Sequence, residues 1–112
     1  MARVAVLVPD LLFGSQVQGA LRAAGHEVAV VRDAAGVGEA QVAVVDLMAD
    51  GVDLPGLAAS PARTLGFFAH VQPEVREAAL AAGFDQVVPR SRMHREGAAL
   101  VARLAGEDAP AG

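Results

Sequence analysis

Four charged side chains follow short apolar runs of the sequence, and their types could support chemistry if the fold brings them together. They are Asp10, Asp46, His70 and Arg90. Two neighbouring carboxylates can share a hard cation such as Mg2+, which proteins often hold by one or two carboxylates plus waters and a phosphate. Alternatively, each aspartate simply ends a strand and caps the loop after it. The spacing alone leaves both interpretations open.

Five short runs of apolar and β-branched residues predict the strands that position these side chains. The runs are Arg3–Val8, Glu27–Val31, Gln41–Val45, Thr64–Ala69 and Gln86–Val88. Such nearly continuous apolar runs are typical of strands buried on both faces of a parallel sheet. Helical patterns alternate with them, which predicts a doubly wound α/β domain with right-handed crossovers. In such sheets, ligand sites form beyond the carboxyl ends of the strands.

The helical patterns predict where the longer helices begin and end. We expect them over Ser15–Ala24, Gln72–Ala82 and Ser91–Leu104. Ser15 and Gln18 would form a capping box for the first helix, and Ser91 would cap the last. Gly25 and Gly83 would end the helices that precede them.

Two connections are too short for full helices. Arg32–Ala40 has room for little more than two helical turns, and Asp50–Pro61 reads as loop with at most one turn. The second and third helices are therefore expected to be shortened or absent. Residues 11–13, which include Phe13, are expected to form an apolar loop that covers the site or meets a partner.

Length and composition exclude several classes of protein. The 112 residues fit one domain, expected over residues 1–106, with a flexible tail over 107–112. There is no cysteine, and the three histidines lack metal-ligand spacing, so neither a thiol nucleophile nor a zinc site is expected. A net charge of -4 with scattered arginines argues against a nucleic-acid partner. No stretch suits a membrane span or a secretory signal, so we expect a cytoplasmic protein without a membrane partner.

Several motifs, in their order along the chain, resemble the receiver domains of two-component response regulators. They are VVDLM around Asp46, Asp10 after the first strand, AAGFD before the fifth strand, and HVQPE from His70. The resemblance covers almost the whole chain and implies a flavodoxin-like five-stranded sheet of order 2-1-3-4-5. It implies that Asp46 corresponds to the aspartate that accepts a phosphoryl group from a histidine kinase. Asp10 would be the surviving acidic Mg2+ ligand, and Met48 would supply a backbone carbonyl ligand.

The chain departs from the receiver pattern at functional positions. Pro9 stands where the first of two adjacent acids is usual, and Phe68 replaces the hydroxyl residue that contacts the phosphoryl group. Arg90 replaces a lysine, whose compact ammonium a planar guanidinium does not reproduce. Val87 stands at the aromatic switch position. The pocket would contain Asp10, Phe68, His70 and Arg90. These departures indicate an atypical receiver, or pseudo-receiver, that requires no cofactor and binds Mg2+ weakly if at all.

We therefore expect a non-enzymatic signalling domain that acts as a protein-protein interaction module without phosphorylation. A signalling partner or a second copy of the chain would bind the last two helices and the fifth strand, because that strand is the edge of a 2-1-3-4-5 sheet. The candidate interface residues are Arg76, Val87, Arg92 and Arg95.

Two other hypotheses stay open. In the second, Asp46 is a working phosphoacceptor despite the substitutions around it. In the third, the chain is a Rossmann-like nucleotide-binding domain in which Asp33 contacts a ribose. Gly14 and Gly19 do not form the glycine fingerprint that a pyrophosphate requires.

Overall fold

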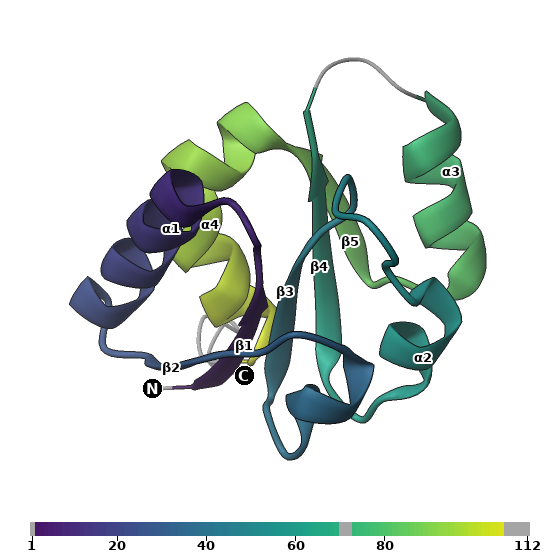
Figure 1. The fold of residues 1–112 in the computed structure, drawn as a ribbon. Helices are drawn as coiled ribbons and strands as arrows, with labels where there is room; N and C mark the ends of the chain where they lie inside the picture. Colours follow the sequence, from purple (N-terminus) through teal and green to yellow (C-terminus); the bar gives the residue numbers. More distant parts are fainter. Residues whose placement is uncertain (1, 70–72, 107–112) are drawn as a thin grey trace.

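The computed structural model describes residues 2–69 and 73–106, and these residues form one parallel five-stranded sheet with helices around it. The strand order is β2-β1-β3-β4-β5 (Figure 1). The strands are β1 (Arg3–Leu7), β2 (Glu27–Val30), β3 (Val42–Asp46), β4 (Arg63–Phe68) and β5 (Gln86–Pro89). The predicted fold class and strand order are confirmed, and each strand boundary lies within one residue of the prediction.

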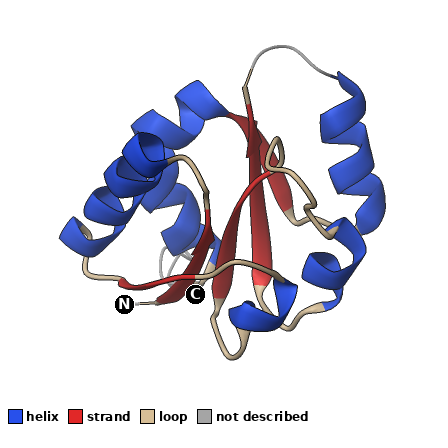
Figure 2. Cartoon of the chain, viewed as in Figure 1, coloured by secondary structure: helices blue, strands red, loops and turns tan. Residues whose placement is uncertain are grey.

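Helices cover both faces of the sheet (Figures 1 and 2). The helical elements are α1 (Leu11–Ala23), η1 (Ala34–Val37), α2 (Leu54–Ala59), α3 (Pro73–Ala82) and α4 (Arg90–Leu104). One core lies under α1 and α4 and contains Val6, Phe67 and Leu100; the other lies under α2 and α3 and contains Val45 and Leu57. Both cores can form because successive side chains of a buried strand point to opposite faces.

The first helix begins four residues earlier than the sequence pattern predicts. Asp10 caps α1, since its Oδ1 accepts a hydrogen bond of 2.8 Å from the amide of Phe13. The predicted capping box of Ser15 and Gln18 is therefore wrong, and so is the apolar loop over residues 11–13. Aspartate is as good an N-cap as the serine five residues later, because its carboxylate accepts a hydrogen bond from a backbone amide that has no partner within the helix. Its negative charge also interacts favourably with the positive end of the helix dipole.

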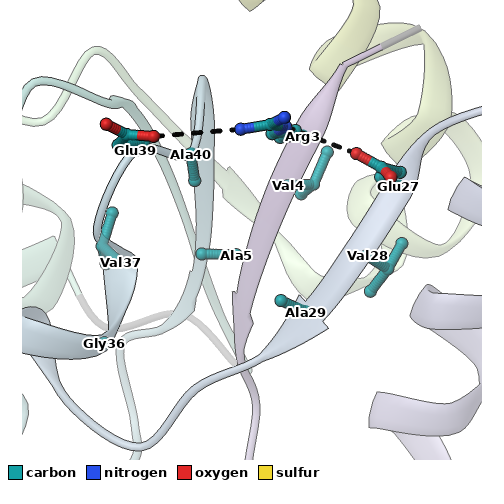
Figure 3. Close-up of a pocket in the computed structure, with 10 residues that line it drawn as sticks. All are labelled: Arg3, Val4, Ala5, Glu27, Val28, Ala29, Gly36, Val37, Glu39 and Ala40. Carbon is teal, nitrogen blue, oxygen red and sulfur yellow. Dashed lines mark ion pairs between the residues drawn. The ribbon is translucent and has the colours of Figure 1, made fainter.

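The second strand is mostly exposed, so the prediction that it is buried on both faces is wrong. Three of the four residues of β2 are exposed, and Val30 retains 58% of its accessible surface. Two causes act together: β2 is an edge strand, and the connection to β3 contains only the short 3-10 helix η1. A hollow of about 350 Å³ remains over β1 and β2, lined by small residues such as Ala5, Ala29 and Val37 (Figure 3).

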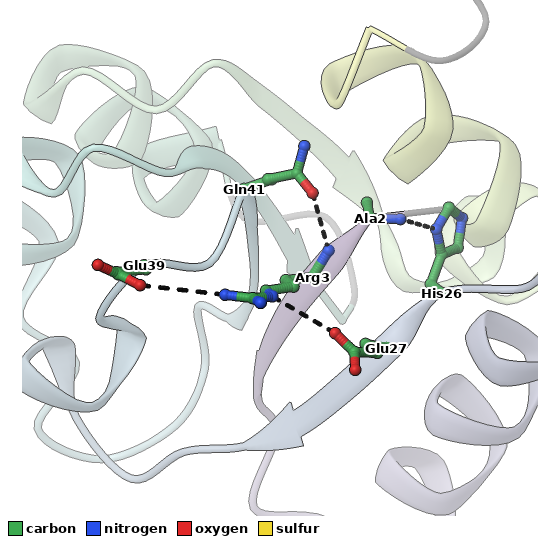
Figure 4. A network of polar contacts seen from close by, with 6 residues as sticks. All are labelled: Ala2, Arg3, His26, Glu27, Glu39 and Gln41. Carbon is green, nitrogen blue, oxygen red and sulfur yellow. Dashed lines mark hydrogen bonds and ion pairs between the residues drawn. The ribbon is translucent and has the colours of Figure 1, made fainter.

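A polar network joins the amino-terminal ends of the first three strands, at the opposite edge of the sheet from the charged strand ends (Figure 4). Arg3 pairs with Glu27 at 3.4 Å and with Glu39 at 4.0 Å. Its amide donates to the side-chain oxygen of Gln41 at 3.0 Å, and Nδ1 of the buried His26 accepts from the amide of Ala2 at 3.1 Å. His26 is thus a structural residue that fixes the first strand.

The start of α4 and the length of α2 differ from the sequence prediction. Pro89, not Ser91, is the N-cap of α4, which begins at Arg90 without a side-chain cap. The third helix, α2, has six residues, more than the single turn expected, and Asp53 caps it. The second and third helices are short, as predicted. Gln72 and the expected tail over 107–112 lie outside the described residues.

A buried threonine and an aspartate join the beginnings of β4 and β5. Oδ2 of Asp85 accepts hydrogen bonds from the amide of Thr64 at 2.7 Å and from its hydroxyl at 3.2 Å. The amide of Asp85 donates back to Oγ1 of Thr64 at 3.0 Å. The AAGFD motif thus has a structural role here, because its aspartate satisfies the polar groups of a threonine with 1% exposure. Among the described residues, no helix is long and apolar enough to cross a membrane.

Candidate functional site

The two aspartates of the predicted site follow neighbouring strands. β1 and β3 pair in parallel, with Leu7 opposite Val45, so their carboxyl ends meet at one edge of the sheet. Asp46 is the last residue of β3 and is half-buried, and its Oδ1 accepts a hydrogen bond of 2.9 Å from the amide of Met48. This bond closes a tight turn after the strand. Its other oxygen accepts no hydrogen bond from the described residues.

Asp10 has both of its carboxylate oxygens engaged within the protein. Oδ1 caps α1 through the amide of Phe13 at 2.8 Å, and Oδ2 lies 3.8 Å from Nη2 of Arg90. The two side chains of this ion pair are 45% and 43% exposed. Such a half-exposed pair contributes little to stability, between zero and about 1 kcal/mol. The ion pair matters electrostatically, because the guanidinium places a positive charge beside a carboxylate that could otherwise bind a metal cation.

Arg90 is held in place by an aromatic ring as well as by Asp10. Its guanidinium carbon lies 4.1 Å from the ring centroid of Phe13, which is a cation–π geometry. The ring of Phe13 in turn packs on that of Phe67, with 5.2 Å between centroids. Both rings are buried, so they form a firm base under the guanidinium. The start of α4 is thereby joined to the start of α1 across the ends of the strands.

The donor set at this edge does not fit a tightly bound Mg2+. A magnesium site needs oxygen ligands free to coordinate in near-octahedral geometry. Asp10 already caps α1 and pairs with Arg90, and one oxygen of Asp46 accepts a hydrogen bond from the amide of Met48. Within residues 2–69 and 73–106, no group of three or more His, Cys, Asp or Glu side chains could hold a metal ion.

The predicted pocket residues divide into two groups. Phe68, which is half-buried, and Arg90 line the same cavity of about 990 Å³ between α1, the end of β4 and the start of α4. Asp10 contacts Arg90 but does not line this cavity. His70 lies outside the described residues.

Sequence reasoning did not place His94 at the site, and it placed Phe13 there only as part of an apolar loop that covers the site or meets a partner. Both line the cavity, and their ring centroids are 6.4 Å apart. The signal for Phe13 was present, because it lies three residues after a capping aspartate and thus on the first turn of a helix. Treating residues 11–13 as a loop concealed it.

The predicted interface residues lie around the β5 edge of the sheet. Arg76 is exposed on α3, and Val87 is half-buried on β5. On α4, Arg92 pairs with Glu96 at 3.3 Å, and the more exposed Arg95 lies 3.9 Å from the same carboxylate. β5 is an edge strand with α3 on one side of the sheet and α4 on the other (Figure 1).

Comparison with known proteins finds similar solved structures but no match at the level of sequence. No family model and no curated protein matches the sequence. Solved structures do match. The signal receiver domain of NarL from Mycobacterium tuberculosis is 27% identical, with 94% of this chain and 96% of that chain covered and a TM-score of 0.77. A response regulator receiver protein from Burkholderia phymatum is 20% identical, with 99% and 100% covered and a TM-score of 0.79. The Francisella response regulator 1452 receiver domain is 16% identical, with 95% and 98% covered and a TM-score of 0.77.

These neighbours match over nearly their full length, and they confirm the predicted resemblance to receiver domains. The chain has the response-regulator receiver fold. In a doubly wound parallel sheet of this kind, ligand sites form beyond the carboxyl ends of the strands. In this chain, the corresponding edge of the sheet contains Asp46, Asp10 and the guanidinium of Arg90.

Proposed function

We propose that this chain is an atypical receiver domain, over residues 1–106, that acts as a protein-protein interaction module without phosphorylation. The observation that carries the proposal is the position of Arg90, whose guanidinium lies between the carboxylate of Asp10 and the ring of Phe13. A permanent cation of the chain thereby balances the remaining acid. The domain would hold one conformation without a metal ion or a phosphoryl group, and it requires no cofactor.

The chemistry of phosphoryl transfer supports the same proposal. Catalysis of this reaction consists mainly of positioning and of stabilising charge on the transferring oxygens. Phe68 offers no hydrogen bond to those oxygens, and the nearby carboxylate of Asp10 balances part of the charge of Arg90. The engaged oxygens of Asp10 leave Mg2+ without its usual carboxylate pair. Asp46 would then be a structural residue that closes the turn after β3.

A surface for a partner is proposed at α3, β5 and α4. β5 is an edge strand and presents unpaired backbone groups, which proteins usually cover or use for association. The helix α3 is mostly exposed, because Ala79 is its one buried residue in the described range and Leu80 keeps 38% of its accessible surface. Arg76, Arg92 and Arg95 form a charged rim that would orient the partner more than it would add affinity. The partner is a signalling protein or a second copy of this chain.

The cellular setting is part of the proposal. We place the domain in the cytoplasm, with no nucleic acid and no membrane among its partners. The net charge of -4 supports the exclusion of these two partners, because phosphate backbones and anionic lipid surfaces repel such a chain unless positive charge is clustered.

The first experiment exposes the protein to a small phosphodonor with Mg2+ and weighs the intact protein by mass spectrometry. We expect little or no acyl phosphate, because the groups that stabilise transferring charge are replaced. Asp46→Ala is the matched control, since any adduct that persists in it lies elsewhere. Stoichiometric modification that disappears in Asp46→Ala would reject the proposal. In a calorimetric titration we expect weak Mg2+ binding, and affinity in the micromolar range would contradict it.

The second experiment reverses charge at the proposed surface. Arg76→Glu combined with Arg95→Glu should reduce association, measured by light scattering for self-association and by pull-down for a partner. Arg22→Glu is the control, because Arg22 lies at the far end of α1, where its side chain donates a hydrogen bond to Gln18. If the double variant behaves as the unmodified chain while Asp10→Ala abolishes binding, the partner surface lies at the acidic edge and this assignment is wrong.

The second candidate function is a phosphorylatable receiver with Asp46 as the phosphoacceptor. One observation favours it: Oδ2 of the half-buried Asp46 accepts no hydrogen bond from the described residues, so a nucleophilic oxygen is available. The mass-spectrometric experiment decides between the two. A nucleotide-binding function has less support, because the carboxylate of Asp10 already occupies the start of α1, where a pyrophosphate would bind.

A further inference from the structure

A large hollow at the carboxyl edge of the sheet lies beside Asp10 and Asp46, and its lining does not include them. It has a volume of about 990 Å³ and opens between α1, the end of β4 and the start of α4. Its apolar surface comes from Phe13, Phe68, Ala69 and Pro89. Small-molecule sites are typically hollows of about 300–1,000 Å³ with apolar walls and a few placed polar groups. The size and the lining both match that description.

The permanent charges that line this cavity, those of Arg90 and Arg95, are both positive. Arg90, His94 and Arg95 line it, and no carboxylate does so within the described residues. The counter-charges lie outside the lining and form only long ion pairs, since Arg90 is 3.8 Å from Asp10 and Arg95 is 3.9 Å from Glu96. Both separations exceed hydrogen-bond length. Glu96 is also shared with Arg92, which lies closer at 3.3 Å. In a chain with a net charge of -4, this is a local site for an anion.

The arginine donors are available for a ligand. A guanidinium has five N–H donors. Neither Arg90 nor Arg95 uses one in a hydrogen bond within the part of the chain that the structure describes. The two side chains are 43% and 68% exposed, so they can turn toward a bound molecule. Guanidinium groups pair with carboxylates and phosphates through two parallel hydrogen bonds, which gives geometric selectivity as well as affinity.

We propose that this cavity binds a small organic anion that has a flat apolar ring and one acidic group. The ring packs against Phe68, Ala69 and Pro89. The acidic group, a carboxylate or a phosphate, meets the guanidinium groups of Arg95 and Arg90. Arg95 also belongs to the proposed partner surface, so an occupied cavity changes the charge that a partner meets. Asp46 lies outside the lining of this cavity.

The experiment follows the backbone amide signals of the full chain by NMR while 2-naphthoate is added. We expect saturable shifts of the signals of Gln16, Ser91 and Arg95, which line the cavity on α1 and α4. The neutral analogue 2-naphthamide has the same ring without the charge, and it should bind about tenfold more weakly because it loses the charge-assisted hydrogen bonds.

Arg95→Gln should weaken naphthoate binding by about tenfold for the same reason. This variant should fold normally because Arg95 is largely exposed, and the dispersion of the amide signals checks that it does. Arg22→Gln removes an arginine from the far end of α1 and should leave affinity unchanged. Three results would overturn the proposal: no saturable shift at millimolar naphthoate, equal affinity for the amide, or unchanged affinity in Arg95→Gln. None of these results bears on whether Asp46 is phosphorylated, so this inference and the proposed function fail separately.

Discussion

Replacing Asp10 tests whether this residue is a structural cap or the remainder of a metal site. Asp10→Ala removes the acceptor of the 2.8 Å bond from the amide of Phe13 and also removes the partner of Arg90. Loss of an N-cap costs about 1 kcal/mol, within a range of about 0.5–2. The half-exposed ion pair adds about 0.3 kcal/mol to this cost, because solvent screens it. We expect the free energy of unfolding to fall by about 1–2 kcal/mol.

The comparison with Asp10→Asn isolates the cap from the charge. Asparagine is as good an N-cap as aspartate, so this variant keeps the hydrogen bond and loses the ion pair and the negative charge at the start of α1. It should be destabilised by about 0.5–1 kcal/mol, because both charge effects are small at a half-exposed position. Asp50→Ala is the control, since Asp50 is an exposed aspartate at the same edge of the sheet, and its effect should stay within about 0.5 kcal/mol.

Urea unfolding followed by circular dichroism measures these differences. Thermal unfolding of Asp10→Ala should show a midpoint about 5–10 °C lower, from the scaling for domains of this size. If Asp10→Ala is instead more stable than the unmodified chain, the carboxylate is repelled by Asp46 more strongly than it caps α1. If Asp10→Asn is as damaging as Asp10→Ala, the charge matters and the cap does not. Either result would refute the structural role assigned to Asp10.

Three further predictions concern the framework that holds the site. Phe67→Ala should lower the free energy of unfolding by about 3–5 kcal/mol in urea, because a ring with 1% exposure is removed from beneath Phe13 and a cavity remains. Gly19→Ala should stabilise α1 by about 0.5–1 kcal/mol, since the added methyl meets nothing within 4 Å, whereas Gly14→Ala should destabilise it because its methyl would lie 3.0 Å from the carbonyl oxygen of Val8; equal thermal midpoints for the two would contradict this. Asp85→Ala should cost about 1–3 kcal/mol in chemical denaturation, because the polar groups of buried Thr64 lose their partner. An unchanged urea midpoint would show that water replaces the carboxylate.

Much of the fold could be predicted because the relevant signals are local. The apolar run of β1 is buried from Val4 to Leu7, as its composition predicts. Gly25 and Gly83, predicted to end helices, adopt positive φ angles of 92° and 111° directly after α1 and α3. Here the residue type and the backbone geometry are linked without reference to the rest of the molecule, because glycine reaches positive φ at little cost.

The errors arose where two local signals competed or where burial depended on a distant element. Asp10 and Ser15 are both acceptable N-caps, and the apolar residues Leu11 and Leu12 after Asp10 suggested a loop. In the structure these two leucines are 90% and 73% exposed on the first turn of α1, while Phe13 turns inward. The run Glu27–Val31 has the composition of a buried strand, yet burial of β2 would need a covering helix that the short connection cannot supply.

The same distinction between local signals and contacts with distant elements applies to the candidate site. The sequence by itself determined which functional groups stand at the strand ends: two carboxylates, an arginine in place of a lysine, and a phenylalanine in place of a hydroxyl. It also determined that the first and third strands would be neighbours, because alternating strands and helices with this resemblance allow few topologies. Only the tertiary structure decided what each group contacts. Arg90 meets Asp10 and Phe13 from a position about eighty residues away in the chain, and that contact exists because α1 and α4 pack side by side on one face of the sheet. Contacts of this kind depend on the relative placement of whole elements, and the local physics of residue type and spacing does not contain that information.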